Sequence, residues 1–216
     1  MRRVLLIVCL LAIAAHTSDA GRHPSGEDVI ALVKRTYDAV NDYRVDVSLT
    51  VKSEMISIKD MRMTVYYKKP DKLHVEAKQG FAIVPTGTYL GNPMDELTRH
   101  TKPVYLKSAK KQGRNCHVIR LDPKSDVAAP KITVWVDAQR GVIVATEMSG
   151  PNRVKSVWRH AKIDGKYYLP VEITAEMSLA GKPGQQGTGK VTLKFANYRV
   201  NKGISDKVFQ QKPRGK

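Results

Sequence analysis

The sequence predicts a mainly β protein of the α+β class, built on one strongly curved antiparallel sheet with a few helices covering its apolar side. Three observations carry this prediction. Many short segments alternate apolar and polar residues, which is typical of antiparallel strands with one buried and one solvated face. One clear helical segment precedes all of them. No repeat of solenoid or propeller length divides the chain, so we expect a single domain.

The segment 1–20 has the features of a secretory signal peptide. Two arginines precede an apolar run at 4–15, and small residues follow at the spacing that signal peptidase requires. The run is too short to cross a bilayer as a mature helix. We therefore expect an exported protein with one domain at 21–210 and a polar, basic tail at 211–216.

Residues 23–43 predict the most certain helix. Ser25 has the position of the N-cap, and Asp28, three residues later, supplies the acid of a capping box. The apolar residues that follow recur near helical spacing and form one stripe: Val29, Leu32, Val33, Tyr37 and Val40. An apolar stripe of this kind must pack against another element.

Almost everything after this helix alternates with a period of two. The expected strands are 43–51, 61–67, 72–78, 117–121, 131–137, 141–149, 171–180 and 190–198. Residues typical of turns separate them, as at 137–141 and 164–166. Two stretches break the pattern. The first, 85–103, is rich in turn formers with a short helix near 94–99, and the second, 203–209, predicts a last helical turn.

A sheet of this width curls because its strands twist, and a few short helices need not fill the resulting trough. An incompletely filled apolar trough binds apolar ligands. Complete filling by side chains is the alternative, and the pattern leaves both open. The candidates for lining a cavity are Met61, Met63, Val65, Leu73, Val75, Val134, Val136, Val171, Ile173 and Met177. Methionine suits an adaptable lining because its side chain is unbranched and flexible.

The charge balance is strongly basic, with 37 Lys and Arg against 20 Asp and Glu and a formal net charge of +17. This excess attracts anionic surfaces such as phospholipid headgroups, acidic glycolipids, cell-wall polymers or acidic partners. The densest basic run, 107–114, has only Tyr105 as a nearby aromatic residue, which argues against single-stranded nucleic acid as a ligand. A solvated lysine-rich surface is the alternative, and for the basic run we favour a solvated hairpin.

Two short motifs resemble catalytic signatures without completing them. Gly184 to Val191 is one residue short of a phosphate-binding P-loop, because Val191 replaces the hydroxyl residue and strand alternation continues where a helix must begin. We interpret this stretch as a hairpin loop. Ser108 to Lys111 fits the Ser-x-x-Lys pattern of penicillin-recognising enzymes, but the companion motifs are absent.

Cys116 and His117 are neighbours and suggest half of a nucleophilic pair or a metal site. Adjacent residues of a strand point to opposite faces, so the two side chains diverge. We expect Cys116 to be a buried structural cysteine. It is the only cysteine beyond 1–20, so no internal disulfide can form. The sequence therefore predicts no catalytic residue, no metal, no cofactor and no enzyme activity.

The order of several segments resembles a known family. "VYYKKPDKLHVEA" at 65–77 is followed by "CHVIRLDPK", "ITVWVDAQRGVIVATEM", "AKIDGKYYLPVEI" and "YRVNKGISDKVF". Together they resemble the periplasmic lipoprotein carriers of the LolA type and their looser relatives. The resemblance implies an open, incomplete β-barrel with helices as a lid over an apolar cavity that receives acyl chains. It also implies a periplasmic monomer without cofactor, which takes its cargo from an inner-membrane exporter to an outer-membrane acceptor.

The resemblance also gives Lys69 a role. In the carriers an arginine before the corner proline hydrogen-bonds the lid helices, and this chain has Lys69 before Pro70. Lysine keeps the charge but loses the planar fork, so the resemblance implies a weaker lid latch at Lys69. The chain departs from the family after the corner, where Thr86 and Gly87 lead into an extended loop.

These observations predict an exported lipid-binding carrier that shields acyl chains of lipoproteins or other lipids during transfer between inner and outer membrane. The alternative is an envelope lipid-sensing or regulatory module on the same fold. A second domain or a partner-binding tail would favour that alternative, and only QQKPRGK, 210–216, follows the last predicted element.

Overall fold

The structure is a computed structural model that describes residues 23–54, 57–78, 93–124, 130–150, 153–180 and 186–210. The signal peptide predicted at 1–20 and the tail predicted at 211–216 lie outside these ranges. So does the Thr86-Gly87 stretch of the extended loop. Within the described ranges, no helix combines the length and the apolar character needed to cross a membrane.

The protein is one antiparallel sheet with three helices in its described part. The strands are β1 (Asp42–Ser53), β2 (Ser57–Lys68), β3 (Lys72–Ala77), β4 (Thr101–Lys111), β5 (Arg114–Pro123), β6 (Ile132–Asp137), β7 (Ile143–Met148), β8 (Arg153–Ile163), β9 (Tyr167–Ala180) and β10 (Gln186–Val200). The helices are α1 (Gly26–Asp38), α2 (Pro93–Thr98) and α3 (Lys207–Gln210). The predicted fold class is confirmed.

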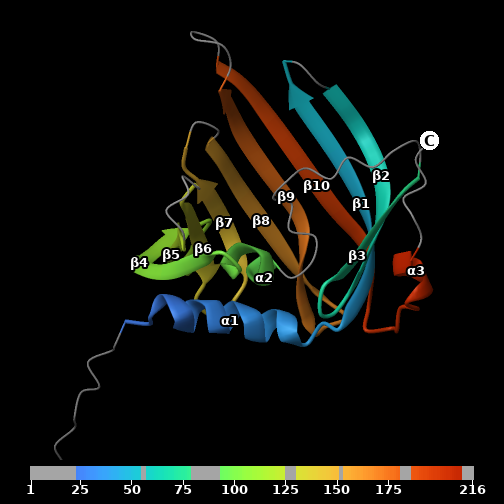
Figure 1. The fold of residues 1–216 in the computed structure, drawn as a ribbon, viewed down its shortest axis with the longest axis horizontal. Coiled ribbons are helices and arrows are strands. Elements are labelled where there is room, and N and C mark those ends of the chain that lie inside the picture. Colours follow the sequence, from blue (N-terminus) through green and yellow to red (C-terminus); the bar gives the residue numbers. More distant parts are fainter. Residues whose placement is uncertain are drawn as a thin grey trace, which may run out of the picture.

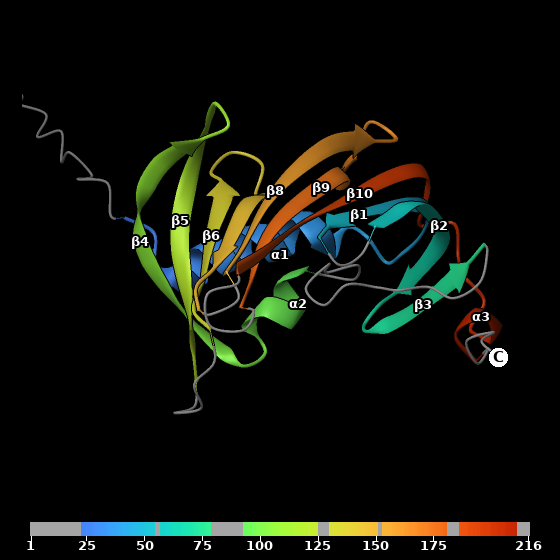
Figure 2. The ribbon, with the colours of Figure 1, turned by 90° about the horizontal axis from the view of Figure 1, so that it is seen from above.

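The ten strands lie in the order β3-β2-β1-β10-β9-β8-β7-β6-β5-β4, and the sheet does not close into a barrel. Each neighbouring pair is consecutive in the chain except β1 and β10, which pair inside the sheet with β2 and β3 on one side and the other six strands on the other. Figure 1 shows α1 along one end of the strands, and Figure 2 shows α2 within the curve of the sheet. We call the face that carries the buried apolar side chains the inner face, and the opposite one the outer face.

Helix α1 begins as the sequence predicts. The Ser25 side chain accepts a hydrogen bond from the Asp28 backbone N–H at 3.1 Å, and the Asp28 carboxylate accepts one from the Ser25 N–H at 2.8 Å. This capping box satisfies two backbone donors at the helix start. The helix ends at Asp38, before the predicted boundary at Tyr43, because strand β1 begins at Asp42.

Both the start and the C-terminal half of α1 approach the sheet closely at a glycine. A Cβ on Gly26 would lie 2.6 Å from the Pro103 carbonyl oxygen of β4. A Cβ on Gly141, in the turn between β6 and β7, would lie 2.6 Å from the Thr36 hydroxyl of α1. The Thr36 hydroxyl also donates to the Arg140 carbonyl at 2.9 Å. These contacts fix α1 against the half of the sheet that contains β4 to β7.

The basic run 107–114 is the hairpin that the sequence analysis expects, because β4 and β5 pair antiparallel across the turn at 112–113 and Lys107 and Lys110 are exposed. The expected strands did not include β4 itself. Strand β8 was not predicted at all. In addition, β10 begins at Gln186, so the part of the predicted hairpin loop from Gln186 to Val191 is strand.

The two edges of the sheet differ. On β4, Lys102, Lys107 and Lys110 are exposed and Pro103 lacks a backbone donor, features that oppose pairing with another strand. On the other edge, α3 lies near β3 (Figure 1). The sheet is therefore protected at both ends by different means.

Candidate functional site

The inner face is a continuous apolar surface across at least five strands. Paired residues form one row from β2 to β8: Met61, Leu49, Leu193, Ile173 and Trp158. All five belong to or pack against one hydrophobic core. Clean alternation in each strand produces this row, because every second residue faces the same way. The arrangement confirms the buried face that the sequence predicts.

Burial on the inner face changes along the strands. Near α1, Val45 and Val65 are fully buried. Toward the opposite strand ends, Val51, Ala175 and Met177 are only partly buried. The apolar surface is therefore closed beside α1 and more accessible toward the ends where β1 stops and β10 begins.

The ten predicted lining residues fall into three groups. Five are buried in the core: Met63, Val65, Val134, Val136 and Ile173. Three are partly buried against it: Met61, Val75 and Met177. The remaining two are more exposed or lie outside this core: Leu73 is 45% exposed, and Val171 is half-buried. Val65 and Val75 are direct cross-strand partners, whereas Val134 and Val136 lie on β6 in the other half of the sheet.

Helix α1 contributes a polar contact to the inner face as well as apolar ones. The Tyr37 hydroxyl lies 3.3 Å from His160 Nε2 on β8, and the His160 ring stacks on Trp158. Burial lowers the pKa of His160 to about 4, with the Arg114 charge acting in the same direction and Asp137 against it. His160 is therefore neutral at physiological pH and belongs to the packing beneath α1.

An aromatic cluster fills the inner face near the end of α1. The Tyr43 ring lies 5.3 Å from that of Tyr67 and 5.8 Å from that of Tyr198, and Phe195 stacks on Tyr198. Burial raises the pKa of Tyr43 above its ordinary value. The sequence interpretation placed Tyr43 and Tyr67 on the apolar face, but the contribution of Tyr198 depends on the bulge in the pairing of β1 with β10.

Lys69 lies at the corner between β2 and β3 and contacts the last turn of α1. Its Nζ donates to the Asp38 backbone carbonyl at 2.6 Å and lies 3.6 Å from the Asp38 carboxylate. Carbonyls at a helix C-terminus lack partners within the helix and carry partial negative charge, so a cation is favoured there. The residue predicted as a latch thus touches the helix end that a latch would hold.

Asn201 also contacts the chain at the end of α1, and the sequence interpretation did not identify it. Its Nδ2 donates to the Ala39 carbonyl at 2.8 Å, and its Oδ1 accepts from the Asn41 N–H at 2.7 Å. The residue has a φ of 53°, which asparagine tolerates better than most residues. The only feature of the sequence that could have indicated Asn201 is its position shortly after a long predicted strand, where asparagine is typical of a turn.

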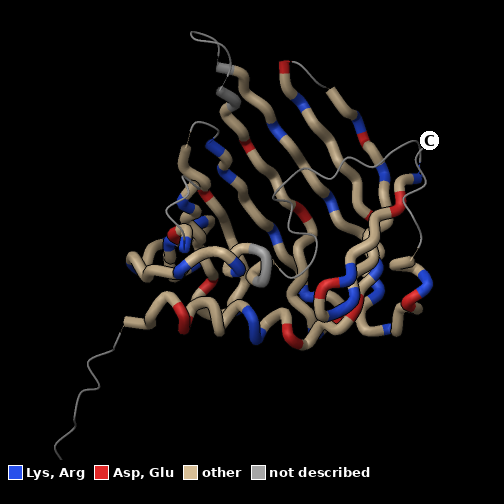
Figure 3. The backbone as a smooth tube through the Cα atoms, in the orientation of Figure 1, with Lys and Arg blue, Asp and Glu red and all other residues tan. Residues whose placement is uncertain are grey.

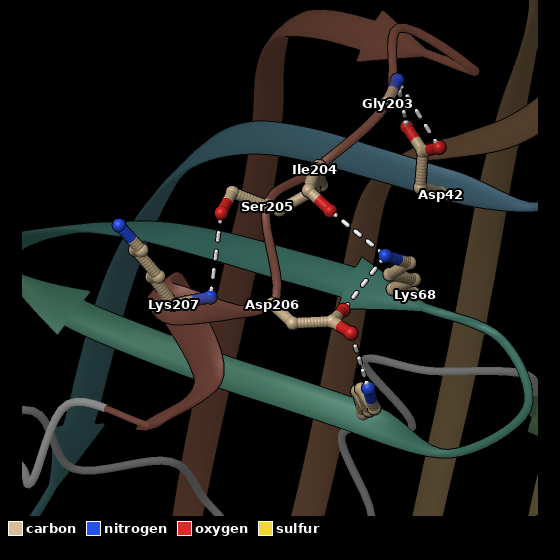
Figure 4. Close-up of polar contacts among 8 residues, drawn as sticks. Asp42, Lys68, Gly203, Ile204, Ser205, Asp206 and Lys207 are labelled. Atoms are coloured by element: carbon tan, nitrogen blue, oxygen red, sulfur yellow. Dashed lines mark hydrogen bonds and ion pairs between the residues drawn. The ribbon is translucent and has the colours of Figure 1, made fainter.

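The segment after β10 is attached to the same corner (Figure 4). Lys68 Nζ donates to the Ile204 carbonyl at 2.9 Å and to the Asp206 carboxylate at 2.7 Å, and Lys72 Nζ lies 3.1 Å from that carboxylate. Hydrogen bonds from Lys68 and then Lys72 lower the pKa of Asp206. The buried Asp42 carboxylate accepts from the Gly203 N–H at 3.3 Å.

The adjacent lysines of the corner therefore have separate partners. Lys68 binds the segment that precedes α3, whereas Lys69 binds the end of α1. Successive residues at a strand end point in different directions, which allows two elements to be held by one corner. We call the set of contacts made by Lys68, Lys69 and Asn201 the corner joint.

Groups suited to covalent or metal chemistry are sparse in the described part of the chain. No cluster of three or more His, Cys, Asp or Glu side chains there could hold a metal ion. Cys116 is 1% exposed on β5, and burial raises the pKa of its thiol. The polar inner-face pair Thr146 and Ser156 is satisfied by a mutual contact of 2.6 Å.

Three solved structures are similar to this chain in fold. A LolA superfamily protein from Nitrosomonas europaea is similar with a TM-score of 0.61 and 14% identity, over 88% of this chain and 99% of that chain. A DUF1329 family protein from Desulfovibrio piger has a TM-score of 0.59 and 11% identity, over 87% and 98%. A domain from Vibrio parahaemolyticus is named as a putative outer membrane lipoprotein-sorting protein. It has a TM-score of 0.57 and 11% identity, over 85% of this chain and 97% of that chain.

A comparison of the sequence with models of protein families shows the family of this chain. A family model described as an uncharacterized protein matches residues 93–213, more than half of the chain, and the chain belongs to that family. No curated protein matches the sequence. The matched region begins at α2 and includes all strands from β4 to β10. The structural similarity to the Nitrosomonas europaea protein covers 88% of this chain and so extends into the strands β1 to β3, which precede the region matched by the family model.

Proposed function

We propose that this protein is an exported, periplasmic lipid-binding carrier. It would shield acyl chains of lipoproteins or other lipids against the inner face of its sheet during transfer between inner and outer membrane. The observation that carries the proposal is the apolar inner face, buried beside α1 and only partly buried at Met61, Val51 and Met177. A surface of this kind supplies an entry for an acyl chain at the end remote from α1.

The energetics are adequate for such a role. Each methylene that is removed from water contributes about 0.8 kcal/mol, so one partly buried acyl chain gives useful affinity. Release then requires a change that exposes the chain again. Helix α1 is held by the corner joint through a few polar contacts at its C-terminal end, and loosening them is a low-cost way to open that end.

The fold relatives support this class of function by name. One belongs to the LolA superfamily and another is named as an outer membrane lipoprotein-sorting domain. In this chain, Lys69 then acts as the lid latch, and the partners are an inner-membrane exporter and an outer-membrane acceptor. The protein itself acts as a monomer without a cofactor and without catalysis.

Native mass spectrometry of protein purified gently from its own envelope tests the proposal. We expect a population with added mass that matches a lipid or an acylated peptide, and uptake of added phospholipid by the empty protein. A ligand-free mass throughout, with no uptake of phospholipid or acylated peptide, would contradict lipid binding. Lipid binding with no transfer between two membrane fractions would favour the sensing module.

A further inference from the structure

The outer face carries a concentrated group of cations at the strand ends farthest from α1. Lys52 on β1 pairs directly with Lys190 on β10, which pairs with Glu176 on β9, which pairs with Lys155 on β8. Arg153 lies one row further along β8. Four cations and one carboxylate thus share a small area of four neighbouring strands, and Glu147 on the next strand, β7, lies 3.7 Å from Lys155 Nζ. Figure 3 shows basic positions recurring along β1, β8 and β10.

These residues line a groove of about 450 Å³ together with the hydroxyl residues Ser178 and Thr188. We call it the basic groove. Within the described residues, Lys52 and Arg153 have no carboxylate within 4 Å, and Lys190 lies 4.0 Å from the exposed Glu176. Like charges placed opposite each other on adjacent strands repel and destabilise the sheet. An arrangement that costs stability in the empty protein is favoured when an anion occupies it.

Apolar groups border the basic groove on the side of β6 and β7. A second hollow there shares Lys155 and Glu176 with the groove and is lined by Trp135 and Val157. Val157 is 38% exposed, and Lys111 Nζ lies 4.7 Å from the centre of the Trp135 ring. A half-buried tryptophan beside cations suits the interface between water and lipid headgroups. A site for a free anion has no need of an apolar border.

The position of the basic groove relates it to the inner face. Met177 and Gly189 line the groove and belong to the strand ends where the inner face is partly buried. An anionic surface that contacts the groove therefore lies beside the accessible end of the apolar face. The alternative basic region on β4, with Lys102, Lys107 and Lys110, lies on an edge strand, whereas the basic groove lies on the interior strands β1, β10, β9 and β8.

We propose that the basic groove docks the protein on a membrane surface through the phosphate groups of anionic phospholipids, with Trp135 at the headgroup level. This docking site extends the proposed function and depends on it for its biological purpose, since it brings the accessible end of the inner face to the bilayer. Binding to the vesicle surface itself is measured without any acyl-chain uptake.

Cosedimentation with vesicles tests the docking site. The wild-type protein should bind vesicles that contain phosphatidylglycerol and not vesicles of phosphatidylcholine alone, and added salt should weaken the binding. Each Lys or Arg near an anionic leaflet contributes on the order of fivefold in partition. The variant K52Q/R153Q/K190Q should therefore lose at least about tenfold in vesicle binding, and the shift of Trp135 emission to shorter wavelength that we expect in the wild type should be absent from this variant.

The matched control is K102Q/K107Q/K110Q, which removes the same charge from β4. It should keep most of the vesicle binding. An equal loss in both variants would assign the binding to net charge, and a loss in the control alone would assign it to β4; either result overturns the proposal. Displacement by inorganic phosphate beyond that by chloride at equal ionic strength would identify a free-anion site instead. Uptake of a fluorescent fatty acid should be unchanged in the groove variant, which separates failure of docking from failure of the proposed function.

Discussion

Lys69 Nζ donates a hydrogen bond of 2.6 Å to the backbone carbonyl of Asp38, so the corner between β2 and β3 is joined to the last turn of α1. The contact lies at the only described helix longer than two turns. It uses both the free carbonyl and the negative end of the helix dipole.

Replacing Lys69 with Leu should loosen the C-terminal end of α1 without unfolding the protein. The contact is partly exposed, so we expect a loss of about 1 kcal/mol or less in the free energy of unfolding. Hydrogen exchange should become faster at the last turn of α1, and bound lipid should dissociate faster. K69R is the control and should retain the protection. Unchanged exchange and retention in K69L would return Lys69 to the role of a solvated corner charge.

His160 should make the protein less stable in mild acid. Its pKa is about 4 in the folded protein because of burial, against an ordinary value of 6.5 in the unfolded chain. Between these values the unfolded chain binds more protons, so stability decreases as the pH falls from 6.5 toward 4, by up to about 3 kcal/mol. The pKa of Asp137 is lowered from 3.8, so this carboxylate loses its contribution only at lower pH.

Denaturant unfolding at several pH values between 4 and 7 measures this effect, with H160Q as the variant that cannot titrate. H160Q should lose some stability at neutral pH through its packing against Tyr37 and Trp158, but its stability should change little across the window. Parallel curves for the two proteins would show that His160 is not the group responsible.

Substitution of Gly141 with Ala should weaken the packing of α1 against the turn between β6 and β7. Gly141 has a φ of 63°, and a Cβ there would lie 2.8 Å from the Leu32 carbonyl oxygen of the helix. We expect a loss of about 2 to 4 kcal/mol in the free energy of unfolding. Gly165 has almost the same φ, 64°, but an added Cβ there would have nothing within 4 Å. G165A should therefore lower the free energy of unfolding only through the strained backbone conformation, by about 1 kcal/mol. Equal losses would mean that α1 moves freely away from the turn.

Asp206 should fasten α3 to the corner. Asn in its place keeps the size of the side chain but removes the charge that Lys68 and Lys72 share. Limited proteolysis should then cut faster within 203–210, while the protease resistance of β10 should not change. D164N, in the exposed turn between β8 and β9, is a control with the same change of charge. Equal cleavage of D206N and wild type would show that the ion pairs do not hold the segment.

Met177 should take part in acyl-chain binding. It is partly buried at the accessible end of the inner face, so M177E places a charge where an acyl chain would enter. We expect at least a tenfold loss in affinity for a fluorescent fatty acid with most of the stability retained. T192E places the same charge on the outer face of the neighbouring strand β10 and should bind normally. Normal binding by M177E would move the entry elsewhere.

The sequence predicts the elements whose signals are local. The capping box at Ser25 and Asp28 defines the start of α1, and the clean alternation in β1, β2 and β10 defines three of the ten strands. Strand β8 escapes detection because its inner-face residues include Ser156 and His160, so a polar residue follows a polar residue along part of the strand. Strand β4 escapes because an edge strand rich in lysine has no strongly buried face.

The site is harder to predict than the sheet because its key contacts join distant segments. Lys69 was identified as a candidate latch only through the family resemblance. Its partner Asp38 is 31 positions away in the sequence. Asn201 and Ala39 are 162 positions apart, and His160 and Tyr37 are 123 apart. No local pattern reports such pairs. The basic groove likewise depends on register, because Lys52 and Lys190 become neighbours only when β1 pairs with β10.

The pairing of β1 with β10 has a consequence for the order of folding. These are the first and last strands in the described part of the chain, and β10 separates β1 from β9 in the sheet. Until β10 is in place, β1 to β3 and β4 to β9 are two unconnected pieces, each with an unpaired edge. Closing so long a loop is slow, so we expect a late, rate-limiting step in which the last strand unites the two halves. A chain halted before β10 would therefore expose two adhesive edges, and folding is safest when the whole chain is available at once.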